Sequence, residues 1–136
     1  MRSHRLDDAA MASIFHLLNS NSTLTDLQLP ANKIGNLGAK ILSESLGANT
    51  ALTAFNISVN QIGADGAKSI SESLKSNTTL RNLNLSYNHL YDKGIKSLLE
   101  SLETNSSLRT LDIACCSFGG AGVKLMCKLL KLNSTL

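Results

Sequence analysis

The sequence of 136 residues is poor in aromatic side chains, which make up 4%, and it contains no tryptophan. Its core must therefore be built from aliphatic side chains, which the abundant leucine and isoleucine supply. Charged residues account for only 17% and hydrophobic residues for 43%. Disordered chains show the opposite balance, so we expect one folded domain of ordinary size.

Cysteine is also scarce, with Cys115, Cys116 and Cys127 as the three examples. An odd number, with two of them adjacent, makes a poor disulfide framework and favours a reducing, cytoplasmic location. Asp7 and Asp8 interrupt the apolar residues near the start, so we expect neither a signal peptide nor contact with a membrane. For a bacterial effector, the cytoplasm in question would be that of the host.

The sequence offers little for catalysis or for charged ligands. The net charge of +3 is too small to indicate a nucleic-acid partner. The histidines and cysteines lack the spacing of metal ligands, and no nucleophile stands next to a base in a known motif. We therefore expect no enzyme activity, no metal and no cofactor.

The sequence does contain a repeat of 28 residues. A step of 28 from Leu24 leads to Leu52, Leu80, Leu108 and Leu136, and other apolar, glycine and asparagine columns keep the same phase. The interval predicts a single domain with a partial repeat at 1–23, full repeats at 24–51, 52–79, 80–107 and 108–135, and a further repeat that begins at the last residue. Both ends interrupt the pattern, which favours a segment of a longer array.

Each repeat has two halves of different periodicity. The segment "LTDLQLPANKIG" alternates around Leu27 and Leu29, which predicts a short strand. The segment "GAKILSESLGAN" places apolar residues at helical spacing and ends at Asn49, which tolerates the left-handed conformation that closes a helix. A strand followed by a helix, four times over, predicts parallel strands with helical crossovers that stack in one dimension.

An asparagine follows each of the first three strands at a fixed offset, as Asn32, Asn60 and Asn88. We expect its side chain to bond to backbone groups of the turn and of neighbouring repeats. Cys116 occupies the fourth position of this column. There it is predicted to be a small, weakly polar filler.

The pattern L-x-x-L-x-L-x-x-N/C-x-L resembles the leucine-rich repeat signature over about residues 24–135. The 28-residue length, the Gly-Ala near the helix start and the alternation of Asn with Cys are similar to the ribonuclease-inhibitor-like subfamily. The resemblance implies an α/β fold, a curved right-handed horseshoe with a parallel sheet on the concave face and helices on the convex face. It also implies non-catalytic binding of a protein partner through the concave sheet, without naming that partner.

Side chains alternate along a strand, so residues between the core leucines are predicted to face outward on the sheet. Ser58 and Ser86 belong to this prediction. The candidate partner-binding residues are Asp26, Gln28, Asn56, Arg81, Asn82, Asn84, Tyr87, His89, Arg109 and Asp112. We expect the tyrosine, the histidine and the two arginines to contribute most, because bulky aromatic and arginine side chains dominate binding energies.

Two other functions remain open from the sequence. The repeats also resemble those of GTPase-activating proteins of the Ran class, which would make the chain a regulator. Alternatively, the apolar ends could make it a structural scaffold that associates with itself. Columns that hold serine in the middle repeats hold Phe15, Leu17 and Leu125 near the ends.

Overall fold

The computed structural model describes residue 6 and residues 8–132. In this part of the chain, five helices alternate with four strands. In chain order they are α1 (Asp8–Ser20), β1 (Asp26–Gln28), α2 (Asn36–Ala48), β2 (Ala54–Asn56), α3 (Ala64–Ser76), β3 (Asn82–Asn84), α4 (Tyr91–Leu102), β4 (Thr110–Asp112) and α5 (Gly120–Leu132). The first residues of the predicted partial repeat, and the further repeat predicted at Leu136, lie outside the described residues.

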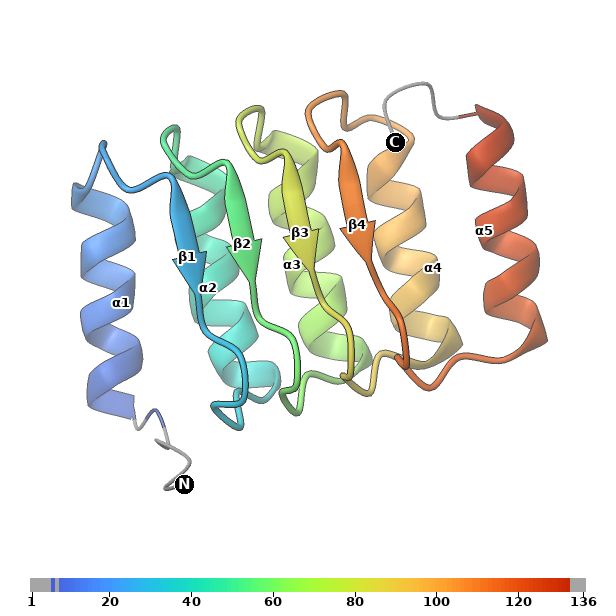
Figure 1. Ribbon diagram of the computed structural model, residues 1–136, viewed down its shortest axis with the longest axis horizontal. Helices are drawn as coiled ribbons and strands as arrows, with labels where there is room; N and C mark the ends of the chain where they lie inside the picture. Colours follow the sequence, from blue (N-terminus) through green and yellow to red (C-terminus); the bar gives the residue numbers. More distant parts are fainter. Residues whose placement is uncertain (1–5, 7, 133–136) are drawn as a thin grey trace.

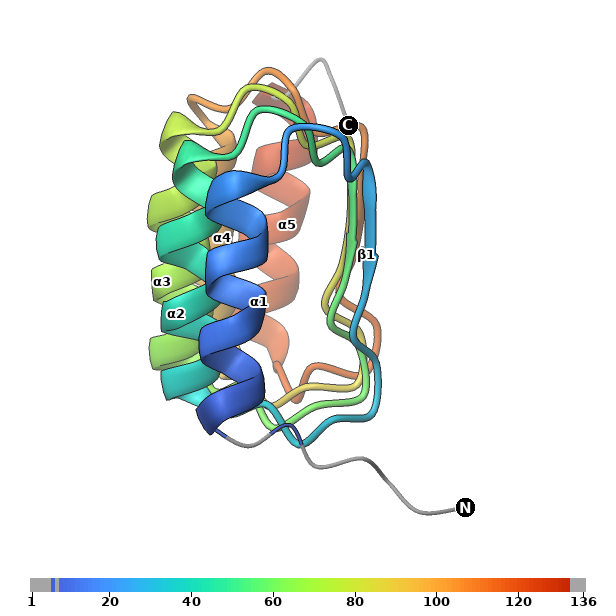
Figure 2. The ribbon, with the colours of Figure 1, turned by 90° about the vertical axis from the view of Figure 1, so that its left-hand side faces the viewer.

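The strands form one parallel sheet in the order β1-β2-β3-β4, as predicted. Leu27 lies opposite Phe55, which lies opposite Leu83, so the register of the sheet equals the repeat length. Figure 1 shows the strands side by side in one layer, and Figure 2 shows all the helices on one side of that layer. No helix of the described residues covers the other side of the sheet (Figure 2).

The leucine columns form the core between the two layers. Leu52 and Leu80 are fully buried, and Leu108 is almost so. Leu24, in the first of these repeats, is only half-buried because fewer repeats cover it. Burying such a side chain contributes about 1.5–3 kcal/mol, so the stack gains stability with each neighbouring repeat.

A buried asparagine joins the ends of β2 and β3 to the preceding repeats, as predicted, whereas Asn32 after β1 is only half-buried. The side-chain oxygen of Asn60 accepts hydrogen bonds from the backbone amides of Asn32 (3.0 Å) and Ile34 (2.9 Å). Its amide group donates to the carbonyls of Leu29 (3.0 Å) and Ile57 (2.9 Å). One side chain therefore satisfies backbone groups of two successive turns, which no apolar residue could do.

Cys116 fills the same position in the fourth repeat. Its thiol donates to the carbonyl of Leu85 at 3.2 Å, whereas Asn88 donates to Ile57 (3.1 Å) and to Leu85 (2.9 Å). Burial raises the pKa of the Cys116 thiol, because a thiolate would lose its hydration. The residue is thus a neutral, weakly polar filler. The loop that leads into α4 also bonds to this residue, since the amide of Tyr91 donates to the Cys116 carbonyl at 3.1 Å.

The asparagines at the helix ends act differently from the prediction. Asn49 has φ −73° and ψ 130°, an extended conformation rather than the left-handed one expected. The side-chain amide of Asn49 donates to the carbonyl of Leu18 at 2.8 Å, and its oxygen accepts from the amide of Leu52 at 2.7 Å. The prediction was wrong because the backbone amide of Asn49 ends the helix by donating to the carbonyl of Ser45, while its side chain bonds to the previous repeat and to the turn that follows.

Candidate functional site

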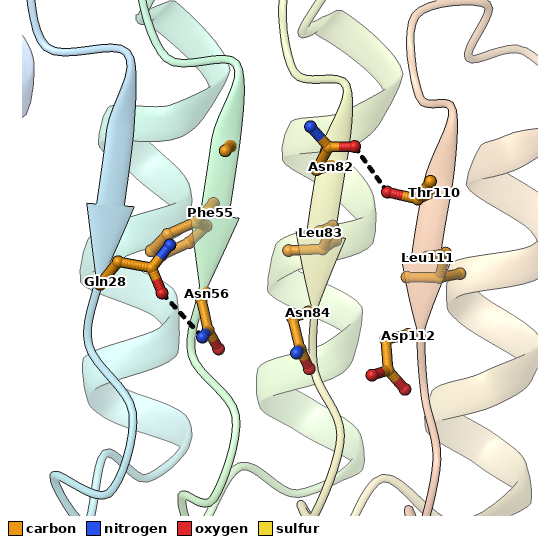
Figure 3. Close-up of a pocket in the computed structure, with 10 residues that line it drawn as sticks. Gln28, Phe55, Asn56, Asn82, Leu83, Asn84, Thr110, Leu111 and Asp112 are labelled. Carbon is orange, nitrogen blue, oxygen red and sulfur yellow. Dashed lines mark hydrogen bonds between the residues drawn. The ribbon is translucent and has the colours of Figure 1, made fainter.

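The uncovered side of the sheet carries the outward side chains of the four strands. We call this surface the open face; its residues are Asp26, Gln28, Ala54, Asn56, Asn82, Asn84, Thr110 and Asp112. Their burial alternates with that of the intervening core residues, so each is exposed or half-buried. Figure 3 shows Gln28, Asn56, Asn84 and Asp112 in a row across the four strands.

A shallow depression of about 350 Å³ lies on this surface (Figure 3). Its lining comes from all four strands and consists of Gln28, Ala54, Phe55, Asn56, Asn82, Leu83, Asn84, Thr110, Leu111 and Asp112. The core residues Phe55, Leu83 and Leu111 contribute to its base, and the rest is mostly amide and carboxylate. A surface of this kind offers many hydrogen-bonding groups around a small apolar area.

Hydrogen bonds between neighbouring side chains order the open face. Asn56 donates to the side-chain oxygen of Gln28 at 2.8 Å, and Gln28 donates to the carboxylate of Asp26 at 2.6 Å. On the other half of the sheet, the hydroxyl of Thr110 donates to the side-chain oxygen of Asn82 at 2.7 Å (Figure 3). Side chains that are already oriented lose less conformational entropy when a partner binds.

The outward-facing residues at the ends of β3 and β4 form hydrogen bonds with the turns that follow these strands. The side-chain oxygen of Asn84 accepts from the amide of Ser86 (2.9 Å) and from its hydroxyl (2.7 Å). The carboxylate of Asp112 accepts from the amide of Ala114 at 3.0 Å. These bonds occupy one side-chain oxygen of Asn84 and one of Asp112. The amide group of Asn84 and the second carboxylate oxygen of Asp112 take no part in them.

Ser58 and Ser86 correct the predicted alternation. Both were expected to face outward, but their exposed fractions are only 7% and 5%. The strands have ended at this point, yet backbone bonds between neighbouring repeats continue, such as the amide of Ala31 to the carbonyl of Ser58 at 3.1 Å. The neighbouring repeats on both sides therefore cover these short side chains, whereas Pro30 and Ala114, at the two ends of the row, are exposed.

The next residue of each of the four full repeats has a positive φ. The values are 59° for Ala31, 55° for Val59, 56° for Tyr87 and 54° for Cys115. This left-handed turn places Tyr87 beyond the end of β3 rather than on the sheet, where the simple alternation had put it. Tyr87 is exposed by 59%, and its hydrogen bond and electrostatic interaction with the Cys115 thiol raise the pKa of its hydroxyl.

Sequence reasoning missed one aromatic residue at this end of the sheet. Tyr91 is exposed by 54% and stacks on His89, with ring centroids 6.4 Å apart and an interplanar angle of 26°. The signal was present, because Tyr91 stands in a column that is glycine in the other full repeats. We call Val59, Tyr87, His89 and Tyr91 the aromatic edge; its three large apolar residues are all more than half exposed.

The two predicted arginines lie at the opposite end of the strands. Arg81 and Arg109 directly precede β3 and β4, and the amide of Arg109 donates to the carbonyl of Arg81 at 2.7 Å. The Arg81 guanidinium also donates to the carbonyl of Ser107 at 2.9 Å. The structure thus brings six predicted residues together on the open face and places Arg81, Arg109, Tyr87 and His89 at its two edges.

Other kinds of site find little support in the described residues. No three His, Cys, Asp or Glu side chains among them come together as a metal site would require. All three cysteines are free, with Cys116 buried and the other two exposed. Within residues 6 and 8–132, no helix has the length and apolar character needed to cross a bilayer.

Comparisons with known proteins agree with the repeat geometry. The sequence family described as "Leucine Rich repeat" matches residues 20–43, 48–71, 76–99 and 104–127, so its matches begin at 28-residue intervals. These four segments cover more than half of the chain. No curated protein matches the chain in sequence.

Two solved structures share the architecture. The structure titled "Leiomodin-1 Actin-Binding Site 2 (ABS2)" superimposes with a TM-score of 0.84 and 27% identity, over 91% of this chain and 74% of the other. The tropomodulin C-terminal domain of Caenorhabditis elegans superimposes with a TM-score of 0.58 and 15% identity, over 90% and 92% of the two chains. The second likeness concerns the fold alone.

Proposed function

The chain belongs to the leucine-rich repeat family, and we propose that it is a non-catalytic module that binds a protein partner on the open face of its sheet. The observation that carries the proposal is the alternation of core and outward-facing side chains along each strand. Leu83 is buried at 2% exposure, while Asn82 and Asn84 on either side of it point outward into the depression. The fold is held by one set of residues, which leaves the other set available to a partner.

The chemistry of the open face suits a protein ligand. Amide and carboxylate groups from four strands are held in place by their mutual hydrogen bonds, and a partner can replace their water with bonds of its own. The exposed tyrosines at one edge and arginines at the other are residue types that contribute strongly to protein interfaces. The shallow, open depression is a poorer fit for a small molecule, which normally requires a more enclosed pocket.

Actin is the first partner to test. The leiomodin-1 structure, whose title names an actin-binding site, is similar to 91% of the length of this chain. The purified chain would be titrated with purified monomeric actin, and with filaments in a sedimentation assay. Binding of either form would identify the partner class.

The binding face can be tested with one matched pair of substitutions. Asn82→Trp introduces a bulky, uncharged side chain on the open face, and Asn19→Trp makes the same change on the exposed surface of α1. The proposal expects Asn82→Trp to weaken partner binding by at least about tenfold and Asn19→Trp to leave it unchanged. Partner binding that is unaffected by Asn82→Trp would place the interface elsewhere.

Self-association is a second candidate, because apolar residues near both ends are exposed. Leu17 on α1 is exposed by 42% and Val123 on α5 by 47%. Light scattering across a range of concentrations tests this directly, and Leu17→Ser should reduce any association found. A regulatory role on small GTPases is tested separately, by measuring GTP turnover with and without the chain. We place the module in a reducing, cytoplasmic compartment, in keeping with its free exposed thiols.

A further inference from the structure

The charges and aromatic groups of the open face are unevenly distributed along the chain. Before β1 and β2 stand Thr25 and Thr53, whereas the equivalent positions before β3 and β4 are Arg81 and Arg109. The aromatic groups beyond the sheet also belong to the third repeat. A partner that uses arginine and aromatic contacts would therefore lie over β3 and β4.

The two arginines form a cationic pair at the amino-terminal edge of these strands. Arg109 is exposed and directly neighbours Arg81, at a strand spacing of about 4.8 Å. The ion pairs found in the described residues join Lys75 to Glu72, Lys93 to Asp65, and Lys96 to Glu100. Neither arginine takes part in them, so the charge of the pair has no internal counter-ion there.

The remainder of this half of the sheet is not cationic. Between the arginines and the aromatic edge lie amides, Thr110 and the exposed carboxylate of Asp112. A nucleic acid would carry phosphates along its whole length and would meet this carboxylate after only two favourable contacts. Affinity for nucleic acid needs more neutralised phosphates than two arginines provide.

We propose that the β3–β4 half of the open face binds an extended acidic segment of a protein partner. A carboxylate of the segment pairs with Arg81 and Arg109, and an apolar side chain of the same segment packs on the aromatic edge near Tyr87. Six residues of chain separate Arg81 from Tyr87, so the two contacts lie at most about 20 Å apart, which is the length of six residues in extended conformation. This inference rests on the proposed function, since it names the ligand of that same surface.

Guanidinium chemistry supports the acidic end of the segment. Arginine binds carboxylates through its planar fork of donors, and two adjacent arginines present two such forks to one or two carboxylates. The bond of Arg81 to the Ser107 carbonyl uses one of its donors and holds the side chain in place. Asp112 further along the strand then disfavours a second acidic group and orients the segment.

The test uses a display library of random peptides of roughly 12 residues, enough for the ~20 Å span when extended. Peptides would be selected on the whole wild-type chain, and their dissociation constants measured by fluorescence anisotropy. The selected peptides are expected to be enriched in Asp and Glu and to carry a hydrophobic residue about six positions away. Binding should weaken as salt increases, because charged surface contacts are screened.

Matched double variants distinguish a specific contact from net charge. Arg81→Ala with Arg109→Ala should raise the dissociation constant by about tenfold or more. Lys40→Ala with Lys68→Ala removes the same charge from exposed positions on α2 and α3, and should change it by less than about twofold. Because Arg81→Ala also removes the bond to Ser107, Arg109→Ala alone is measured as well and should account for part of the loss.

Each remaining outcome overturns the proposal in a recognisable way. Selected peptides that lack acidic residues, and whose binding is lost with Asn82→Trp but retained in the arginine variants, would leave the open face as the binding surface and refute the acidic ligand. Tighter binding of a single-stranded RNA oligonucleotide than of any acidic peptide, lost in the arginine variants, would replace the ligand class. Peptides that bind regardless of both Asn82→Trp and the arginine changes would refute the proposed function too.

Discussion

The side-chain amide of Asn60 donates a 3.0 Å hydrogen bond to the carbonyl of Leu29, a residue of the preceding repeat. The same side chain accepts bonds from two amides of that repeat and is only 5% exposed. A single buried amide thus holds two successive turns at a fixed distance. The spacing of the strands, and with it the geometry of the open face, depends on bonds of this kind.

Asn60→Ala should therefore be strongly destabilising. It leaves the amides of Asn32 and Ile34 without the oxygen that they share, and an unsatisfied buried group costs about 1–3 kcal/mol. The expected loss in the free energy of unfolding is about 3 kcal/mol or more, measured by urea denaturation. The matched control is Asn32→Ala, because Asn32 is half-buried and its side chain, among the described residues, donates only to the nearby carbonyl of Pro30. Equal losses for the two variants would contradict this role.

Val59→Asn should stabilise the protein. Val59 has a φ of 55°, a conformation that is costly for a β-branched residue and readily tolerated by asparagine. Its side chain is exposed by 51%, so the substitution removes little packing. We expect a gain of about 1 kcal/mol in the free energy of unfolding. Gln61→Asn serves as the control for asparagine at an exposed position in the same loop and should give no gain; a lower stability for Val59→Asn would show that the strain is absent.

The three cysteines should differ in reactivity. Alkylation requires the thiolate, and burial both raises the pKa of Cys116 and shields its sulfur. In the folded protein at neutral pH, iodoacetamide should modify the exposed Cys115 and Cys127 while sparing Cys116. Mass spectrometry of the digested protein locates the modified positions, and denaturant should make all three reactive. Early modification of Cys116 under native conditions would indicate that this repeat is open.

Much of the fold could be predicted from the sequence, because the repeat interval fixes the register. A leucine at Leu27 must meet the residue 28 positions later, so Phe55 and Leu83 follow from counting alone. The buried contacts of Asn60 also followed, since a polar residue repeated next to a core column needs partners inside the stack. The extended conformation of Asn49 did not follow, because the sequence does not reveal whether an asparagine after a helix turns left-handed or stays extended and bonds through its side chain to the previous repeat.

The site was only partly accessible from the sequence. Strict alternation placed Asn82 and Asn84 correctly on the open face, but it fails where the strand ends. Beyond that point the chain turns, so Ser86 becomes covered by its neighbours and Tyr87 is moved to the edge. Tyr91 did not follow from strand alternation, because it is the first residue of α4, although a large residue in a glycine column is a visible departure from the repeat.

Neighbouring residues of one strand serve different purposes, since Leu83 stabilises the fold and Asn82 belongs to the proposed binding surface. The most direct measurement compares the free energies of unfolding of Leu83→Ala and Asn82→Ala by urea denaturation. Leu83 is 2% exposed, and its truncation should cost about 2–5 kcal/mol. Asn82 is exposed on the open face, and its truncation should cost less than about 0.5 kcal/mol. Losses of equal size, or a larger loss for Asn82→Ala, would contradict the account.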